Sequence, residues 1–367
     1  MSEREIAVHA EPLKELVKNI FMKLSVPEGD AFTVADNLVA ADLRGIPSHG
    51  VARLDRYVKG IQDGLIVPVT KLSILVETNS TATLDAHDGL GQVAGKTAME
   101  RAIGKAKKNG AGFVSVCRSN HYGIAAYYSM MALPHDMIGI SMTNSAPLVV
   151  PTFGREIIVG TNPLSVAAPA GKEYPFVLDM ATSTVPRGKV EVYDRKGETM
   201  PQGWATDAEG RSTSDATLVL KNLIERKGGG LLPLGGEGEL LGGHKGFGLS
   251  LMLDILTGVL AGGNFGNHLY EKKDGKAVPA NVCHLFGALD IKGFRLVAQF
   301  KQSLDQYIRE IKNSPKAAGH DRIYIHGEKE YEMTKRYSKS GVPLHPKTAE
   351  MIRRIAGTLG LDAGAMT

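Results

Sequence analysis

The sequence predicts a mixed α/β protein, in which a central sheet is flanked by helices and a further helical element lies at the N-terminus. Three observations lead to this fold class. Apolar residues recur at helical spacing through the first 65 residues, and alternating runs rich in β-branched residues begin near residue 70. From there to about residue 313, single strands alternate with helices, as in sheets covered by helices. With 367 residues, the chain is expected to form two or three domains.

The N-terminal element is expected to hold three helices. The first is indicated by apolar residues at helical spacing, namely Leu13, Leu16, Val17, Ile20, Phe21 and Leu24. A second amphipathic run ends at Leu43, where Gly45 and then Pro47 prevent the helix from continuing. Ser48 is a favoured N-cap residue, so a third helix is expected to follow it.

The later elements are expected in the following order. Strands are predicted at KLSILVET and STATLDA, followed by a helix over residues 92–108 that Gly110 ends. The strand GFVSVC leads into the apolar helix IAAYYSMMAL, which Pro134 closes. Further strands are predicted at MIGISM, LSVAAP, FVLDM and FGALDI, and further helices near 184–194, 246–262 and 296–313.

Composition excludes several classes of function. Hydrophobic residues make up 43% of the chain and charged residues 22%, as in an ordinary globular enzyme. The net charge of +4 is not gathered into a basic block with aromatics, so no nucleic acid is expected as a partner. No apolar run approaches a membrane span, and the charged N-terminal stretch lacks the core of a secretory signal. Cys117 and Cys283 form no metal-ligand or disulfide pattern, which suits the reducing cytoplasm.

The segment LRGIPSHGVARLDRY places His49 and Arg53 four residues apart. If a helix begins near Ser48, the two side chains lie on one face. A guanidinium can hold a carboxylate through two parallel hydrogen bonds, and an imidazole can exchange a hydroxyl proton near neutral pH. The pair therefore suits a 2-hydroxy acid. The alternative is that Ser48 only caps a helix and His49 is an ordinary surface residue.

Polar residues after other predicted strands could complete such a site. His121 is expected at the start of a helix, where the dipole would lower its pKa and leave a neutral imidazole able to accept a proton. A capping role explains it equally well. Two polar clusters follow predicted strands, one at Thr143, Asn144 and Ser145 and the other at Thr161 and Asn162. They could bind a nicotinamide amide or a carboxylate. The alternative is that they only form turns. No ligand spacing predicts a metal site.

Glycine is concentrated in one segment. Residues 228–248 contain ten glycines in 21 positions, so the backbone there could approach a ligand closely or move as a lid. A disordered surface loop is the alternative. The segment ends in His244 and Lys245 before an apolar helix, where backbone N–H groups attract phosphate.

A second glycine pattern, at Gly89, Gly91 and Gly95, looks like the fingerprint of a Rossmann dinucleotide site. Two aspartates, Asp85 and Asp88, separate the preceding strand from these glycines and would repel a pyrophosphate. The glycines are therefore interpreted as a turn and a tight helix start.

Six segments in a fixed order resemble the malate/L-lactate dehydrogenase family, which includes ureidoglycolate and sulfolactate dehydrogenases and cyclic imine reductases. They are RGIPSHGVARLDRYV, SNHYGIAAYY, TNSAP, PTFGREIIVGTNPLSVAAPAG, FVLDMATSTVPRGKV and GGHKGFGLSLMLDILTGVLAG. The resemblance covers nearly the whole chain. It implies a non-Rossmann NAD(P)-binding fold with a mixed sheet, an NAD(P)-dependent oxidoreductase and a homodimer.

The resemblance also implies roles for individual residues. Ser48 and His49 match a proton relay, and Arg53 matches the arginine that binds the substrate carboxylate. His121 matches the proton acceptor of some members, so the choice between His49 and His121 stays open. Substrate contacts are expected at Thr161, Arg187, Gly188 and Lys189. Cofactor contacts are expected at His121, Tyr122, Gly123, Asn144, Asp179, Met180, Ala181, His244, Lys245, Asp321 and Arg322.

The chain departs from the family pattern at two places. Lys189 stands where imine reductases tend to have aspartate, which favours an anionic hydroxy acid. His326, Gly327 and Glu328 replace the common Pro-Gly-Glu, and the lost proline leaves the loop near Asp321 and Arg322 less fixed.

Three domains are expected. Residues 1–70 form a helical domain that carries the Ser-His and Arg segment and is joined by C-terminal helices within 330–367. Residues 71–120 and 265–330 form the mixed-sheet body, and residues 121–264 bind the cofactor.

The expected reaction is hydride transfer between NAD and a small-molecule 2-hydroxy acid, with (S)-malate favoured. Lactate, sulfolactate, ureidoglycolate and a diketo sugar acid are the alternative substrates, and NADP is the alternative cofactor. A non-enzymatic protein with an anion-binding face on the third helix is the competing class.

Overall fold

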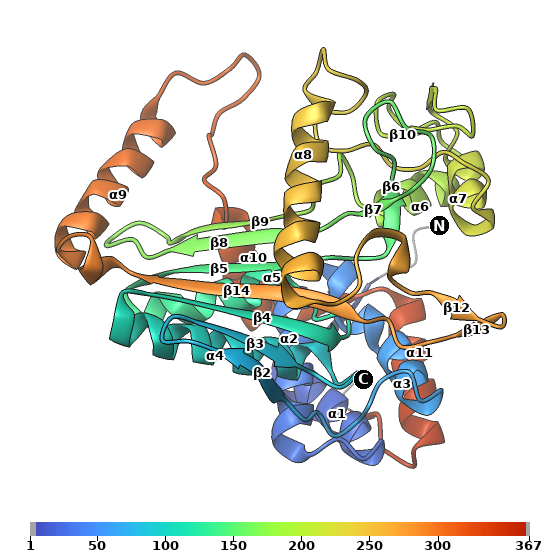
Figure 1. Ribbon diagram of the computed structural model, residues 1–367, viewed down its shortest axis with the longest axis horizontal. Coiled ribbons are helices and arrows are strands. Elements are labelled where there is room, and N and C mark those ends of the chain that lie inside the picture. Colours follow the sequence, from blue (N-terminus) through green and yellow to red (C-terminus); the bar gives the residue numbers. More distant parts are fainter. Residues whose placement is uncertain (1–4, 365–367) are drawn as a thin grey trace.

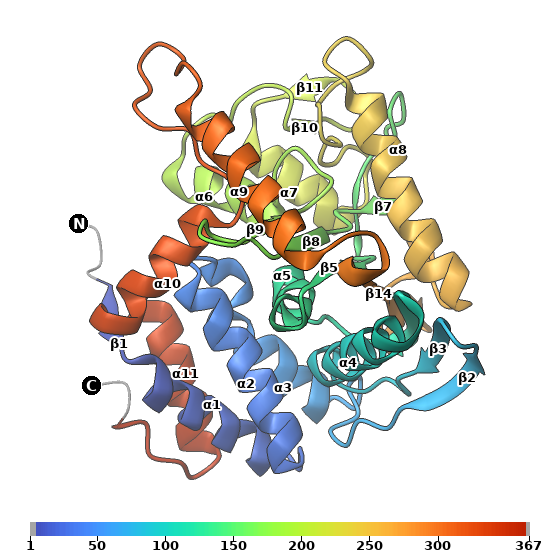
Figure 2. The same ribbon diagram turned by 90° about the vertical axis from the view of Figure 1, so that its left-hand side faces the viewer.

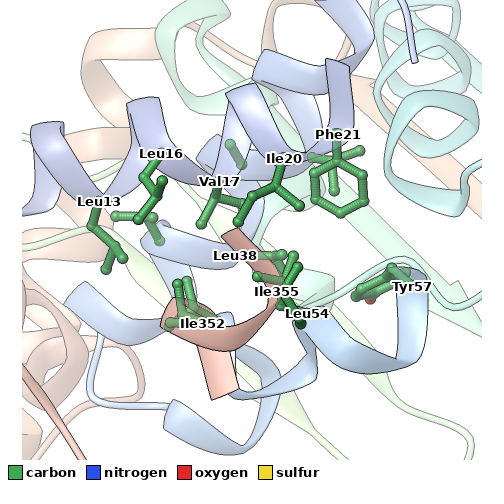
Figure 3. Close-up of a cluster of buried hydrophobic side chains, with 14 of the residues drawn as sticks. Leu13, Leu16, Val17, Ile20, Phe21, Leu38, Leu54, Tyr57, Ile352 and Ile355 are labelled. Carbon is green, nitrogen blue, oxygen red and sulfur yellow. The ribbon is translucent and has the colours of Figure 1, made fainter. Parts of the chain in front are cut away.

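The computed structural model describes residues 5–364. Segments from its N-terminal and C-terminal parts form one helical unit. Helices α1 (Ala10–Lys23), α2 (Glu28–Leu43), α3 (Leu54–Gln62) and α11 (Pro346–Thr358) surround a shared apolar core. Figure 3 shows Ile20 of α1 above Leu38 of α2, with Ile355 of α11 beside them. Strands β1 (Ile6–Val8) and β15 (Val342–Leu344) pair antiparallel, and α10 (Glu328–Ser340) precedes β15.

The body of the molecule is a seven-stranded mixed sheet in the order β2-β3-β4-β14-β5-β8-β9. Its strands are β2 (Ser73–Glu77), β3 (Thr81–Asp85), β4 (Ala111–Ser119), β5 (Met137–Thr143), β8 (Leu164–Ala168), β9 (Phe176–Met180) and β14 (Val282–Asp290). Only β3 and β4 run parallel, since α4 (Gly91–Asn109) crosses between them, and all other neighbours are antiparallel. The chain returns late to insert β14 at the centre.

Helices cover both faces of this sheet (Figure 1). On one face, Ala98 and Met99 of α4 and Tyr128 of α5 (Ala125–Ser129) pack on Val114 and Phe286 of the sheet. The other face carries α8 (Gly243–Asp254) and its π-helical continuation (Ile255–Val259). Figure 2 shows the four-helix unit at one corner, beside α4. The predicted mixed α/β class is therefore confirmed.

A smaller lobe adjoins the α8 side of the sheet. Its elements are β6 (Pro147–Val149), β7 (Val159–Gly160), α6 (Arg187–Lys196), β10 (Ala205–Thr206), β11 (Ser212–Thr213) and α7 (Ala216–Glu225). Val150, Val190, Val219 and Leu231 meet in its own core. The hairpin β12 (Lys272–Lys273) and β13 (Lys276–Ala277) and the helix α9 (Val297–Asn313) complete the fold. None of the described helices combines the length and apolar character of a bilayer span.

The prediction that a helix begins at Ser48 is wrong. Two 3₁₀ turns, Pro47–His49 and Val51–Arg53, occupy this stretch, and α3 begins only at Leu54. The backbone of Gly50 is extended between the two turns and breaks the continuity that a helix needs. His49 and Arg53 are therefore not related as helical neighbours.

Candidate active site

The segment that carries His49 and Arg53 is folded around a buried carboxylate. Asp42 lies at the end of α2, and its Oδ2 accepts a hydrogen bond from the Val51 N–H at 2.8 Å. Burial raises the pKa of Asp42 to about 7, and the Val51 hydrogen bond opposes the rise. A Cβ at Gly50 would overlap this carboxylate, so the turn requires glycine there. Sequence reasoning missed Asp42, because nothing local shows where its side chain points.

Two imidazoles from distant parts of the chain lie together. The rings of His49 and His121 stack with centroids 5.6 Å apart and an interplanar angle of 25°. The loop that carries His121 is held against residues 88–89, because Asn120 Nδ2 donates to the carbonyl oxygens of Asp88 and Gly89. Gly91 faces the Asn120 and His121 carbonyls so closely that a Cβ would overlap them. The interpretation of this glycine as a tight helix start is confirmed, because α4 begins at Gly91.

Each histidine has a hydroxyl neighbour. His49 Nδ1 lies 3.0 Å from Ser48 Oγ, and His121 Nδ1 lies 2.6 Å from the Tyr57 hydroxyl. Tyr57 is buried in the helical unit, and sequence reasoning missed it. A signal was present, because Tyr57 lies in the first turns of α3, four residues after Arg53, the residue that directly precedes this helix.

Both imidazoles are held neutral at physiological pH. Burial, with the nearby Arg53 and Arg56 guanidinium groups, lowers the pKa of His49 to about 4. Burial and the same cations, together with His49, lower the pKa of His121 well below its usual value. The predicted cause for His121, a helix start, is wrong, because α5 begins only at Ala125. A neutral imidazole is the form that can accept a proton.

Two arginines, Arg53 and Arg56, lie near the histidine pair, and a third, Arg187, lies near Arg53. Arg53 Nε donates to the Ser48 carbonyl at 2.6 Å, and Arg56 donates to the Tyr270 hydroxyl at 2.6 Å. Arg187, at the start of α6, pairs with Glu191 at 2.9 Å. Burial lowers the pKa of Arg53, and Arg56 and Arg187 lower it further, while Tyr57 and the Glu191 partner of Arg187 oppose the change. This excess of positive charge suits an anionic ligand with more than one negative group.

The remaining predicted substrate residues have contacts of their own. Gly188 follows Arg187 in the first turn of α6, whereas the Lys189 ammonium lies 5.9 Å from the centre of the Trp204 ring. Thr161 Oγ1 lies 3.3 Å from Ser145 Oγ. Lys189 thus lies over an aromatic face, and its role as a substrate contact stays a prediction.

Several predicted cofactor residues are engaged by the protein itself. The buried Asn144 amide donates to Asp254 and to the Asn264 carbonyl, and it accepts from the Cys283 N–H. Tyr122 is buried in the core, where it stacks on His284 with centroids 4.6 Å apart. The side chains of both residues are therefore held by contacts within the protein.

Others lie far from the histidine pair along the chain. Asp179 on β9 accepts the Ala126 N–H at 2.8 Å, and burial raises its pKa to about 6. Arg322 forms ion pairs with Glu328 at 2.9 Å and Glu332 at 2.6 Å. The other predicted cofactor contacts are at least partly accessible to solvent. They are Met180, Ala181, His244, Lys245 and Asp321.

A cavity of about 300 Å³ adjoins Asp179. Its walls are formed by Arg44, Ile46, Val177, Asp179, Tyr324, Ile325, His326, Gly327, Lys329 and Glu330. The Arg44 Nε is buried there without a hydrogen-bond partner among residues 5–364. A cavity of this size with an unpaired cationic donor fits one half of a dinucleotide. Within the same described chain, no group of three His, Cys, Asp or Glu side chains is placed to hold a metal ion.

Comparisons with known proteins agree with this geometry. Residues 8–353 match the malate/L-lactate dehydrogenase family. The chain is 50% identical to a malate dehydrogenase from Pyrococcus abyssi, over 98% of this chain and 97% of that protein. It is 39% identical to an L-sulfolactate dehydrogenase from Methanocaldococcus jannaschii, over 95% and 96% of the two chains.

A solved structure is also similar over almost the full length. Malate dehydrogenase from Pyrococcus horikoshii superposes with a TM-score of 0.87 at 46% identity, covering 98% of this chain and 97% of that chain. The neutral histidine pair and its arginines thus occur within a dehydrogenase fold. The chain belongs to the malate/L-lactate dehydrogenase family and is an oxidoreductase of that family.

Proposed function

We propose that this enzyme interconverts (S)-malate and oxaloacetate with a nicotinamide cofactor. The observation that carries the proposal is the pair of neutral histidines, His49 and His121, which lie near Arg53 and Arg56, with Arg187 in turn near Arg53. A substrate with two carboxylates matches the positive charge, and its hydroxyl matches a neutral imidazole. The names of the Pyrococcus relatives support malate as the substrate.

The proposed mechanism assigns one task to each side chain. Arg53 holds the C1 carboxylate in a bidentate fork, and Arg187, with Lys189, Gly188 and Thr161 nearby, receives the distal carboxylate. His121, or His49 acting with Ser48, removes the hydroxyl proton as C2 loses its hydride. In the reverse direction the protonated histidine stabilises charge on the carbonyl oxygen.

The cofactor, when bound, supplies the hydride acceptor. Asp179, Met180 and Ala181 at the end of β9 and the adjoining cavity would hold one part of it, with the unpaired Arg44 donor facing that part. The exposed His244 and Lys245 at the start of α8 would meet a phosphate, and Asp321 and Arg322 are more peripheral. The loop of His121, Tyr122 and Gly123 would face the nicotinamide, with Asn144 as a further proposed contact. NAD is the proposed cofactor and NADP the alternative.

An assay at 340 nm tests this function. Oxaloacetate, pyruvate and sulfopyruvate are each reduced with NADH and with NADPH, and kcat/KM is compared. We expect oxaloacetate with NADH to give the highest value. An enzyme that consumes neither cofactor with any 2-oxo acid would contradict the proposal.

Sulfolactate is the second candidate substrate. A sulfonate carries the same charge as a carboxylate and accepts hydrogen bonds from arginine, so Arg187 could bind either group. The 39% identity with a sulfolactate dehydrogenase supports this candidate. A higher kcat/KM for sulfopyruvate than for oxaloacetate would favour it.

A homodimer is proposed from the outer face of α8. Apolar side chains are exposed along it and its π-helical continuation, namely Leu251, Met252, Ile255, Val259 and Leu260. A helix that is apolar on all sides is normally covered, and a second copy of the chain is the proposed cover. We expect light scattering to give a dimer, which Ile255→Glu dissociates. Ile224→Glu, at an exposed position of α7, is the matched control and should leave the dimer intact.

The proposed location is the cytoplasm. Cys117 and Cys283 are buried as free thiols, which suits a reducing compartment.

A further inference from the structure

Two hydrogen-bond donors face one ring nitrogen of His121. The Tyr57 hydroxyl lies 2.6 Å from His121 Nδ1, and the Gly123 N–H is directed at the same atom at 3.4 Å. The two donors come from separate parts of the chain, namely α3 and the loop after β4. Their convergence on Nδ1 limits which ring nitrogen of His121 can carry the proton.

Both donors are held in place by the surrounding fold. Tyr57 is 1% exposed in the core of the helical unit (Figure 3), where its ring meets that of Phe21 edge-on. Gly123 has a left-handed backbone with a φ of +83°, and a Cβ there would overlap the side-chain oxygen of Asn37. The turn after His121 therefore requires glycine, and this turn directs the N–H of residue 123 back to the ring.

The nature of the two donors fixes the tautomer. A backbone N–H can only donate, so the Gly123 contact requires a lone pair on His121 Nδ1. This bond is long and weak, but a proton on Nδ1 would turn it into a repulsive contact. Burial raises the pKa of the Tyr57 hydroxyl, and the nearby Arg56 opposes that rise without cancelling it, so the hydroxyl keeps a proton to donate. The single ring proton of neutral His121 is then on Nε2.

His49 is not restricted in the same way. Its Nδ1 lies 3.0 Å from Ser48 Oγ, and a hydroxyl, unlike a backbone N–H, can accept a hydrogen bond as well as donate one. His49 can therefore carry its proton on Nδ1, directed at Ser48, and present the Nε2 lone pair.

We propose that Tyr57 holds neutral His121 in the Nε2–H tautomer, with the Gly123 N–H in support. His121 then donates a hydrogen bond to the substrate oxygen, and His49 is the residue that accepts the proton. In malate oxidation the O–H bond breaks and its proton goes to His49 Nε2, the C2–H electron pair leaves as hydride for the nicotinamide, and the C–O bond becomes a carbonyl. His121 stabilises the charge that develops on this oxygen. The inference rests on the proposed function and makes Tyr57 a positioning residue.

The charged and titratable groups around the two imidazoles are compatible with this division. Arg53 and Arg56 lie near both rings and carry only donors, so they disfavour a second proton on either ring without choosing between its nitrogens. His284 is a further neighbour of His121, and burial lowers its pKa to about 3, so it adds no positive charge there. The contacts at Nδ1 therefore decide the tautomer.

Nitrogen-15 NMR of histidine-labelled enzyme tests the tautomer without turnover. At pH 7, His121 should show an unprotonated Nδ1 and a protonated Nε2, and the loss of signals in His121→Gln identifies them. Tyr57→Phe removes the closer donor and should produce a mixture of both tautomers. Tyr127→Phe is the matched control, because the Tyr127 hydroxyl donates to Asp36 at 2.8 Å, and it should leave the signals unchanged. A protonated Nδ1 of neutral His121 in the wild type would overturn the proposal.

Glutamine substitutions separate the two roles, because glutamine retains an N–H donor but cannot accept the proton. His121→Gln should keep kcat for malate oxidation within about tenfold of the wild type, whereas His49→Gln should lower it about 10²- to 10⁴-fold. A larger loss in His121→Gln than in His49→Gln would identify His121 as the base and refute the division of roles.

Tyr57→Phe should lower kcat on the order of 10- to 100-fold with KM within about twofold, as for other groups that orient a functional histidine. A variant that loses only thermal stability would show that Tyr57 is merely structural, and the proposal would fail. Failure of the proposed function itself is seen separately, as a wild-type enzyme without turnover of malate.

Discussion

The carboxylate of Asp42 occupies the space that a Cβ of residue 50 would need. Gly50 joins the two 3₁₀ turns that present His49 and Arg53, so the backbone between the proton-accepting and anion-binding groups rests directly on a buried acid. The end of α2, through Asp42, therefore determines the local geometry of the site.

Gly50→Ala should damage both stability and activity. The added methyl group would push the turn away from Asp42, at a cost of about 1–3 kcal/mol, as for other overpacked sites. We expect kcat/KM to fall because His49 and Arg53 are displaced together. Gly104→Ala is the matched control, since a Cβ there meets nothing within 4 Å inside α4. Urea unfolding should show the control unchanged or about 0.5–1 kcal/mol more stable.

Asp42→Asn should change how stability depends on pH. The folded-state pKa of Asp42 is raised from its ordinary 3.8 to about 7, so its contribution is fully present below pH 4 and is lost as pH rises to about 7. Asparagine keeps an oxygen acceptor for the Val51 N–H and does not titrate. The free energy of unfolding of the variant relative to wild type should therefore increase between pH 4 and 7, on the order of 2–4 kcal/mol.

Urea titrations of both proteins at pH 4, 5.5, 7 and 8 measure this difference. The comparison at pH 4, where Asp42 is protonated in the folded state and about half ionised in the unfolded chain, serves as the reference. A difference that stays constant with pH would show that Asp42 is ionised in the folded protein.

Arg53→Lys should mainly raise KM. Lysine retains the positive charge but cannot form the planar fork that holds a carboxylate through two hydrogen bonds. We expect KM for malate to rise about 10- to 100-fold while kcat changes little, because the proton acceptor is untouched. Arg211→Lys is the control, since Arg211 is exposed and pairs with Asp207 in the smaller lobe. An equal KM for malate in the wild type and in Arg53→Lys would show that Arg53 does not bind the substrate carboxylate.

The sequence allowed the local part of the site to be predicted. Ser48, His49 and Arg53 lie within six residues, so their spacing was informative even though the intervening backbone forms 3₁₀ turns instead of a helix. The central sheet was predicted strand by strand because each long strand has its own apolar pattern. The short pairs β6–β7 and β10–β11 and the helix α7 were not predicted, since their packing in the small lobe decides their conformation.

The contacts that connect distant segments could not be predicted. Tyr270 lies 214 residues from Arg56 in the chain. Only the folded structure shows that Tyr57 and His121 meet. The depressed pKa of His121 was expected for the wrong reason, because burial and arginines cause it in place of a helix dipole.

Binding of a dicarboxylate should raise the pKa values of the site histidines. In the free enzyme, burial and the two neighbouring guanidinium groups lower the pKa of His49 to about 4, and that of His121 is also depressed. Two carboxylates placed between Arg53 and Arg187 would offset the positive charge, so the imidazolium forms become less costly by roughly one to three pH units.

NMR titration of histidine-labelled enzyme with and without malonate, a dicarboxylate that lacks the reacting hydroxyl, measures this shift directly. His49→Asn and His121→Asn assign the two signals. In the free enzyme both imidazoles should remain neutral down to about pH 5, whereas malonate should bring protonation closer to neutral pH. Arg53→Ala provides the control, because malonate should then bind weakly and leave the titration unchanged. A malonate complex whose histidines titrate at the same pH as the free enzyme would show that the anion binds elsewhere, and the arginines would no longer define the substrate position.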